Sequence, residues 1–117
     1  MVTRRTVTIV SANDDTLHEL VPYLARAGLE ARGTKSIGIH RTSSVVVFFP
    51  DEFPRADLLA EVERLPRHVV CVIVTKEPAQ FAVDDRTVVI PKPAWGWTIL
   101  DAITDRLPAE TRRSTRS

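Results

Sequence analysis

Val45-Val46-Val47-Phe48-Phe49 is an unbroken apolar run in the middle of the chain. A strand with one face in solvent alternates polar and apolar residues, so this run predicts a strand covered by helices on both faces, as in a parallel sheet. The stretch from Val69 to Val74 has the same character, and Val88-Val89-Ile90 is a shorter version of it.

Toward the N-terminus, the β-branched stretch Thr6 to Val10 predicts another strand. Asn13 and Asp14 are candidate N-caps for a helix that ends near Gly28, with Pro22 expected to kink it. The segment from Leu29 to Arg32 is interpreted as a short second strand. The apolar residues of this helix recur at helical spacing: Leu17, Leu20, Val21, Leu24 and Ala27.

Toward the C-terminus, Pro54 can occupy the first turn of a helix that Pro66 ends. Its predicted apolar stripe is Leu58, Leu59, Val62 and Leu65. A last helix is lined by Ile99, Leu100, Ile103 and Leu107 and is stopped by Pro108. Strands that alternate with helices predict an α/β fold, and five of them favour the flavodoxin-like parallel sheet with strand order 2-1-3-4-5.

Two crossovers are short. The gaps Gly33 to Ser43 and Lys76 to Arg86 are each about as long as the shortest complete crossover, roughly 10–12 residues. We therefore expect the second and fourth helices of the fold to be shortened or absent. In the second gap, Pro78 to Ala82 is the single segment with helical character.

Length and charge restrict the function classes. We interpret residues 1–108 as one domain and residues 109–117 as a disordered basic tail, because residues 110–117 are Arg, Ser, Thr and Glu only and cannot bury apolar surface. The net charge is +1, so the whole domain has no electrostatic case for nucleic acid or a membrane surface. The sole cysteine, Cys71, is expected to be buried, and the chain is expected to be cytoplasmic.

In a parallel sheet of this order, functional residues gather at the carboxyl ends of the strands. Here these ends carry Ser11 to Asp14, Pro50 to Phe53, Thr75-Lys76 and Pro91 to Trp95. The stretches Val89-Ile90-Pro91-Lys92-Pro93 and Val72-Ile73-Val74-Thr75 resemble the fifth and fourth strands of response-regulator receiver domains. The resemblance extends over residues 5–107 and implies a signalling role.

A working receiver, as the resemblance implies, holds Mg²⁺ with an acid pair after its first strand and accepts a phosphoryl group on an Asp after its third. Ser11 and Ala12 stand at the acid-pair positions, and Pro50 stands at the nucleophile position. Only Thr75 and Lys92 match the residues that contact the phosphoryl oxygens. The sequence therefore predicts a vestigial pocket without metal, cofactor or enzymatic activity.

Nearby carboxylates leave an alternative open. Asp51, Asp14 or Asp15 would supply a shifted acidic site, although capping and helix-dipole roles explain them more simply. Glu52 is interpreted in the same way, beside Asp51 at the helix that follows Pro54. The structural interpretation of Lys92 is that it pairs with a nearby acid such as Asp14 or Asp51, or with a strand-end carbonyl. The functional alternative is that it binds a small anion with Thr75 and Ser11.

Aromatic residues are the candidates for partner binding. Trp95 and Trp97 flank a glycine just after Pro93, which the resemblance implies to follow a cis peptide bond. We expect one Trp to cover the core and the other to be partly exposed, and Phe53 and Phe81 to join the same patch.

Three hypotheses follow. The first is a non-phosphorylatable pseudo-receiver that binds a protein partner in bacterial signal transduction or protein localisation, with a homodimer possible. The second is an atypical receiver that is phosphorylated at a shifted Asp or binds a small anion near Lys92. The third, a nucleic-acid accessory module that uses the basic tail, is disfavoured by the net charge.

Overall fold

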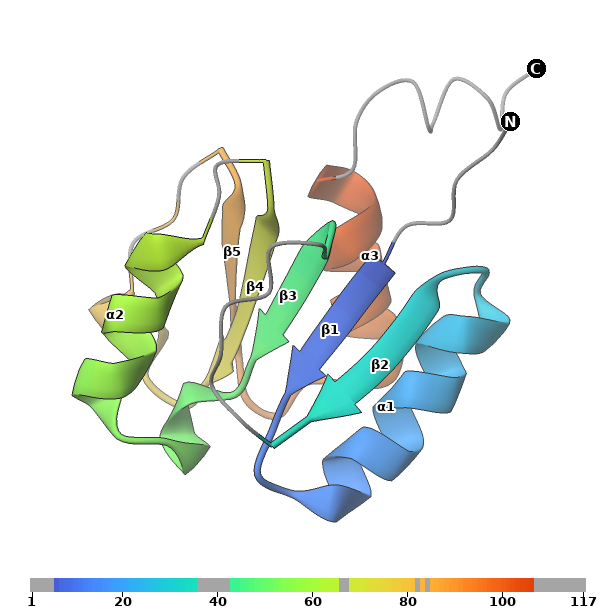
Figure 1. Cartoon of the computed structure of the whole chain (residues 1–117), viewed down its shortest axis with the longest axis horizontal. Helices are drawn as coiled ribbons and strands as arrows, with labels where there is room; N and C mark the ends of the chain where they lie inside the picture. Colours follow the sequence, from blue (N-terminus) through green and yellow to red (C-terminus); the bar gives the residue numbers. More distant parts are fainter. Residues whose placement is uncertain (1–5, 36–42, 66–67, 82, 84, 107–117) are drawn as a thin grey trace.

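A computed structural model of the chain describes residues 6–35, 43–65, 68–81, 83 and 85–106. Five parallel strands form one sheet in the order β2-β1-β3-β4-β5 (Figure 1). They are β1 (Thr6–Val10), β2 (Glu30–Thr34), β3 (Val45–Phe48), β4 (Val70–Thr75) and β5 (Thr87–Pro91). The predicted strand order and fold class are confirmed; β1 has its predicted boundaries, and those of the other strands are shifted by at most two residues.

In the described part of the chain, three α-helices cover the sheet: α1 (Asp14–Arg26), α2 (Arg55–Arg64) and α3 (Gly96–Arg106). In Figure 1, α2 lies on one side of the sheet and α1 and α3 lie on the other. Among the described residues of the crossover between β4 and β5, the helical structure is limited to a 3₁₀ turn, η2 (Pro78–Gln80), so the expectation that the fourth helix is shortened or absent is confirmed. Residues 36–42, where the second helix would fall, lie outside the described residues.

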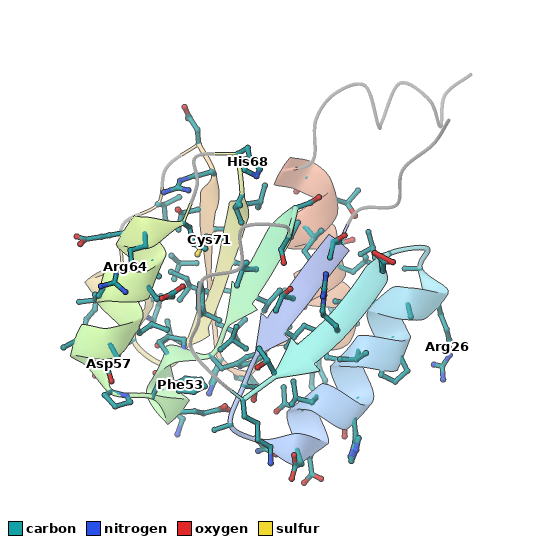
Figure 2. The ribbon with its side chains drawn as sticks, in the orientation of Figure 1. Arg26, Phe53, Asp57, Arg64, His68 and Cys71 are labelled. Atoms are coloured by element: carbon teal, nitrogen blue, oxygen red, sulfur yellow. The ribbon has the colours of Figure 1, made fainter. Side chains whose placement is uncertain are left out.

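The core has two halves because β3 and β4 are apolar on both faces. Val45 and Val47 point toward α1 and α3, whereas Val46 and Phe48 point toward α2. All four are fully buried, as expected for a central parallel strand. Cys71 is buried on the α2 side of the sheet, where Figure 2 labels it.

Helix α1 begins and ends as its sequence predicts. The Asn13 side chain accepts a hydrogen bond from the Asp15 N–H at 2.8 Å, so Asn13 is the N-cap, and Asp14 stands in the first turn. Arg26 lies in the last turn and projects into solvent (Figure 2). Its positive charge interacts favourably with the negative end of the helix dipole. Gly28 follows with a φ of 96°, a left-handed conformation that favours glycine.

Helix α2 differs from its predicted apolar stripe. Leu58 is fully buried, but Leu59 is 41% exposed because it is turned about 100° from Leu58 around the helix axis. Glu61, three residues after Leu58, is buried in its place. Among the described residues, no helix is both long enough and apolar enough to cross a membrane.

Candidate functional site

The carboxyl ends of β1, β3, β4 and β5 bring the predicted pocket residues to one edge of the sheet. Ser11 follows β1 and Thr75 ends β4, and both are completely buried. Pro50 follows β3 and is also buried, whereas Ala12 is exposed. Lys92 directly follows β5, and its peptide bond to Pro93 is cis.

Asp51 provides the carboxylate at the centre of this pocket. Its Oδ1 accepts a hydrogen bond from the Thr75 hydroxyl at 2.8 Å, and its Oδ2 accepts one from the Lys76 N–H at 2.9 Å. The Lys92 ammonium lies 3.4 Å from Oδ2. Asp51 thus binds a hydroxyl, a backbone amide and a cation at the same time, so both of its oxygens are in use.

These donors favour the ionised form of Asp51. Partial burial raises the pKa of this carboxyl, but the hydrogen bonds from Lys76 and Thr75 and the charge of Lys92 together outweigh it. The pKa of Asp51 is therefore held below its ordinary value. Asp51 is an anion at neutral pH, and it offsets the charge of Lys92.

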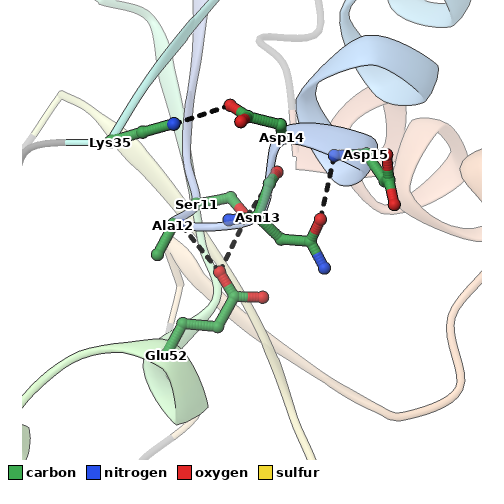
Figure 3. A network of polar contacts seen from close by, with 7 residues as sticks. All are labelled: Ser11, Ala12, Asn13, Asp14, Asp15, Lys35 and Glu52. Atoms are coloured by element: carbon green, nitrogen blue, oxygen red, sulfur yellow. Dashed lines mark hydrogen bonds and ion pairs between the residues drawn. The ribbon is translucent and has the colours of Figure 1, made fainter.

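Glu52 makes a second set of contacts beside the first strand. Its Oε1 accepts hydrogen bonds from the Ser11 hydroxyl at 2.7 Å and from the Ala12 N–H at 2.7 Å (Figure 3). The Ser11 oxygen also accepts a hydrogen bond from the Asn13 N–H at 3.1 Å. The two acid-pair positions of the receiver pattern are therefore bound to a carboxylate that comes from another loop.

The predicted capping roles of Asp51 and Glu52 are wrong. Neither side chain caps α2, which begins without a side-chain capping hydrogen bond. Both residues lie in a 3₁₀ turn, η1 (Pro50–Glu52), which directs their carboxylates back toward the strand ends. In a strand, neighbouring side chains point to opposite faces of the sheet. This alternation does not determine the directions of Asp51 and Glu52, because β3 ends at Phe48 and both residues follow it.

Asp14 and Asp15 do not join this cluster. Asp14 forms an exposed ion pair with Lys35 at 2.8 Å, and the hydrogen bond from Lys35 lowers the pKa of Asp14. Figure 3 shows the Asp15 side chain directed away from Glu52. Within the described part of the chain, no group of three or more His, Cys, Asp or Glu side chains is placed to hold a metal ion.

The tryptophans lie beside the pocket and are more exposed than expected. Trp95 is 63% exposed and Trp97 is 59% exposed, so the expectation that one of them covers the core is wrong. Ala94 and Ile99 pack against the core near this place instead. Both indoles line a groove of about 540 Å³ between α1 and residues 92–97.

Phe53 and Phe81 do not belong to the same patch as the tryptophans, contrary to expectation. They line a separate hollow together with Pro50, Asp51 and Leu58, and they pack against the core on the α2 side. Figure 2 shows Phe53 near the start of α2. The sheet separates the two pairs, since the groove at Trp95 and Trp97 opens on the side of α1 and α3.

Comparison with known proteins identifies the fold. No protein-family model matches the sequence, and no curated protein matches it. The chain is similar to the structure of a CheY-like response regulator receiver domain from Methylobacillus flagellatus, with a TM-score of 0.69 and 13% identity over 90% of this chain and 100% of that one. It is also similar to a response regulator from Thermotoga maritima, with a TM-score of 0.64 and 15% identity over 89% of this chain and 98% of that one.

The chain is also similar to a third solved structure. It is a putative pilus assembly-related protein from Burkholderia pseudomallei, with a TM-score of 0.57 and 15% identity over 87% of this chain and 88% of that one. At these identities the likeness establishes the fold alone. The chain therefore has a receiver-like fold, as its strand ends predict.

Proposed function

We propose that this chain, a receiver-like domain, is a phosphorylation-independent pseudo-receiver that acts by binding a protein partner in the bacterial cytoplasm. The receiver-like fold suggests a role in signal transduction. In this proposal the domain has one fixed state and no catalytic activity, and its output depends on the presence of its partner.

The observation that carries the proposal is the position of the Asp51 carboxylate. Thr75 and Lys92 are the residues that, by the receiver pattern, would contact phosphoryl oxygens. Here both of them, together with the Lys76 N–H, bind Asp51. An incoming phosphoryl group would have to displace this carboxylate and would meet its negative charge at close range.

The residues around Asp51 support the same conclusion. Pro50, at the nucleophile position, has no group that can form an acyl phosphate. Ser11 and Ala12, at the metal-binding positions, supply no carboxylate and are hydrogen-bonded to Glu52. In a receiver, Mg²⁺ offsets the negative charge of the transferred phosphoryl group, and an aspartate carboxylate accepts that group. The residues that stand at these positions here supply neither the carboxylates for the metal nor the acceptor.

The element that would respond to phosphorylation is also reduced. Between β4 and β5 the residues that the structure describes form η2 and no α-helix that could be repositioned. The exposed Trp95 and Trp97 support the binding role, because tryptophan is enriched where partners contribute most of their binding energy.

Treatment with a phosphodonor tests the proposal. The full chain is incubated with acetyl phosphate and Mg²⁺ at neutral pH, and its intact mass and its amide NMR spectrum are recorded. We expect no mass gain and no shifts at Thr75, Lys76 or Lys92. A receiver domain with its acid pair and aspartate intact serves as the positive control, and a phosphoryl adduct on this chain would overturn the proposal.

A second function is favoured by the same cluster. Asp51 lies within hydrogen-bonding reach of Thr75 and beside Lys92, so it is the carboxylate through which an atypical receiver would be phosphorylated. In that case the mass gain is present in the wild type and absent in Asp51→Asn. Saturable amide shifts upon titration with inorganic phosphate, without a mass gain, would instead support a small-anion site near Lys92.

A further inference from the structure

The groove between α1 and residues 92–97 combines exposed aromatic rings with more carboxylates than cations. We call it the Trp groove and define it by Glu19, Tyr23, Glu52, Lys92, Trp95 and Trp97, which all line it. Its volume of about 540 Å³ lies within the range of sites that hold a drug-sized ligand or a few side chains.

On the aromatic side of the Trp groove, the start of α3 packs closely on the Tyr23 ring of α1. A Cβ on Gly96 would lie 3.1 Å from the Tyr23 ring, so the absence of a side chain at Gly96 allows the start of α3 to pack on that ring. Trp95 and Trp97 flank this contact and leave more than half of their surface in solvent.

The charges of the groove are acidic in sum. Glu19 and Glu52 contribute two carboxylates among the lining residues, against one cation, Lys92. The Lys92 charge is already offset by Asp51 at 3.4 Å, and its ammonium lies 5.8 Å from the centre of the Phe49 ring. In Figure 3 the second carboxylate oxygen of Glu52 points away from Ser11 and Ala12, which bind the first.

We infer that the Trp groove binds a protein segment in which an arginine stands next to an apolar residue. The guanidinium stacks on an indole and pairs with Glu19 or Glu52, while the apolar neighbour packs against the second indole and Pro93. A planar guanidinium suits this arrangement better than an ammonium does, because it stacks and forms bidentate hydrogen bonds. This inference rests on the proposed role in protein binding and adds the chemistry of the partner.

The experiment uses a phage-displayed library of random short peptides, selected on the immobilised full chain. We expect the recovered peptides to be enriched in arginine beside leucine, isoleucine or an aromatic residue. The best of them is synthesised together with its Arg→Gln counterpart, and both are titrated against the chain by NMR. Only the arginine peptide is expected to shift the amide signals of Lys92 and of residues 94–97 at low concentration.

Variants of the chain then separate charge from aromatic packing. Glu19→Gln combined with Glu52→Gln removes both charges, while the amide oxygen introduced by Glu52→Gln can still accept hydrogen bonds from Ser11 and Ala12. Trp97→Ala removes an indole. We expect each variant to weaken binding of the selected peptide at least about tenfold. The matched controls, on the exposed face of α2, are expected to change it less than about twofold; they are Glu63→Gln and Leu59→Ala.

The inference is overturned by recovery of acidic or uncharged peptides, by recovery of none, or by equal affinity for the Arg and Gln peptides. It is also overturned if binding persists in both groove variants. These failures are distinct from failure of the proposed function, which would show as a phosphoryl adduct regardless of which peptides bind. If the chain gains no phosphoryl group and selects no arginine peptide, only the inferred chemistry of the partner is refuted.

Discussion

At the scale of single residues, Asp51 links three parts of the chain that are far apart in sequence. Its carboxylate connects η1 to the end of β4 through Thr75 and Lys76, and to the end of β5 through Lys92. A hydrogen bond to a charged group is stronger than one between neutral groups. Asp51 therefore contributes to stability as well as to the state of the pocket.

This contribution depends on pH in a defined direction. The pKa of Asp51 in the folded chain is below its ordinary value of 3.8, so the stabilisation is complete above that value and is lost as the pH falls through the folded pKa. At pH 7 we expect Asp51→Asn to lower the free energy of unfolding by about 1 kcal/mol. This is less than a hydrogen bond to a buried charged group usually contributes, because the Asp51 side chain is partly exposed and solvent screens its charge.

Urea unfolding followed by far-UV circular dichroism at a series of pH values measures this effect. The difference between wild type and Asp51→Asn should shrink as the pH is lowered below 3.8. Asp101→Asn, at an exposed position of α3, is the control and should show a smaller difference at pH 7. A difference for Asp51→Asn that stays constant down to the lowest pH contradicts the assignment of the ion pair.

The site was partly predictable from the sequence. Thr75 and Lys92 end or follow apolar strands, and parallel topology brings such ends together, so their proximity follows from the strand pattern. The carboxylates of Asp51 and Glu52 reach the same edge through η1, a 3₁₀ turn between Pro50 and Pro54. The two prolines signal a turn there, but side-chain direction in such a turn depends on backbone angles that no periodicity encodes.

At the scale of elements, β2 shows how a helix is seated on the sheet. Gly33 lies in this strand, and a Cβ there would approach the Leu17 Cδ2 to 2.7 Å and the Val21 Cγ2 to 3.3 Å. Leu17 and Val21 are one helical turn apart on α1. The missing side chain of Gly33 therefore makes room for the ridge of α1.

We expect Gly33→Val to lower the free energy of unfolding by roughly 1–3 kcal/mol, because the added methyl groups force Leu17 and the first turns of α1 outward. Arg32→Val is the matched control, since neighbouring strand residues face opposite sides and Arg32 is exposed. Its effect should stay within about 0.5 kcal/mol. Denaturant unfolding compares the two, and equal stability of Gly33→Val and wild type would refute this packing.

The elements themselves were largely predictable, and their environments less so. The apolar runs identify β3 and β4 because strands buried on both faces need apolar residues at nearly every position. The β-branched residues identify β1 although it contains Thr6 and Thr8. Leu59 and the tryptophans were misplaced for a different reason. Their apolar character predicts burial. The exposure of Leu59, however, depends on which side of α2 meets the sheet. The exposure of the tryptophans follows because Ala94 and Ile99 already cover the core at this place.

At the scale of the whole molecule, the near balance of acidic and basic residues predicts little attraction to nucleic acid. The net charge is +1, and the Trp groove has an excess of carboxylates. Nonspecific DNA binding depends mainly on neutralised phosphates and weakens steeply with salt.

We therefore expect a dissociation constant weaker than about 0.1 mM for a labelled DNA duplex at physiological salt, measured by fluorescence anisotropy. A variant without residues 109–117, which lie outside the described residues, should bind as weakly as the full chain. Tight, steeply salt-dependent binding that disappears with this deletion would instead support a nucleic-acid accessory role.

The composition of the Trp groove has one further consequence, for spectroscopy. The chain contains two tryptophans and one tyrosine, and all three line this groove. Its ultraviolet emission and near-ultraviolet dichroism therefore originate almost entirely from one location on the surface. A ligand at that location can be detected without a label, whereas a thermal melt recorded by emission would follow the local environment of these three rings and needs a backbone signal beside it.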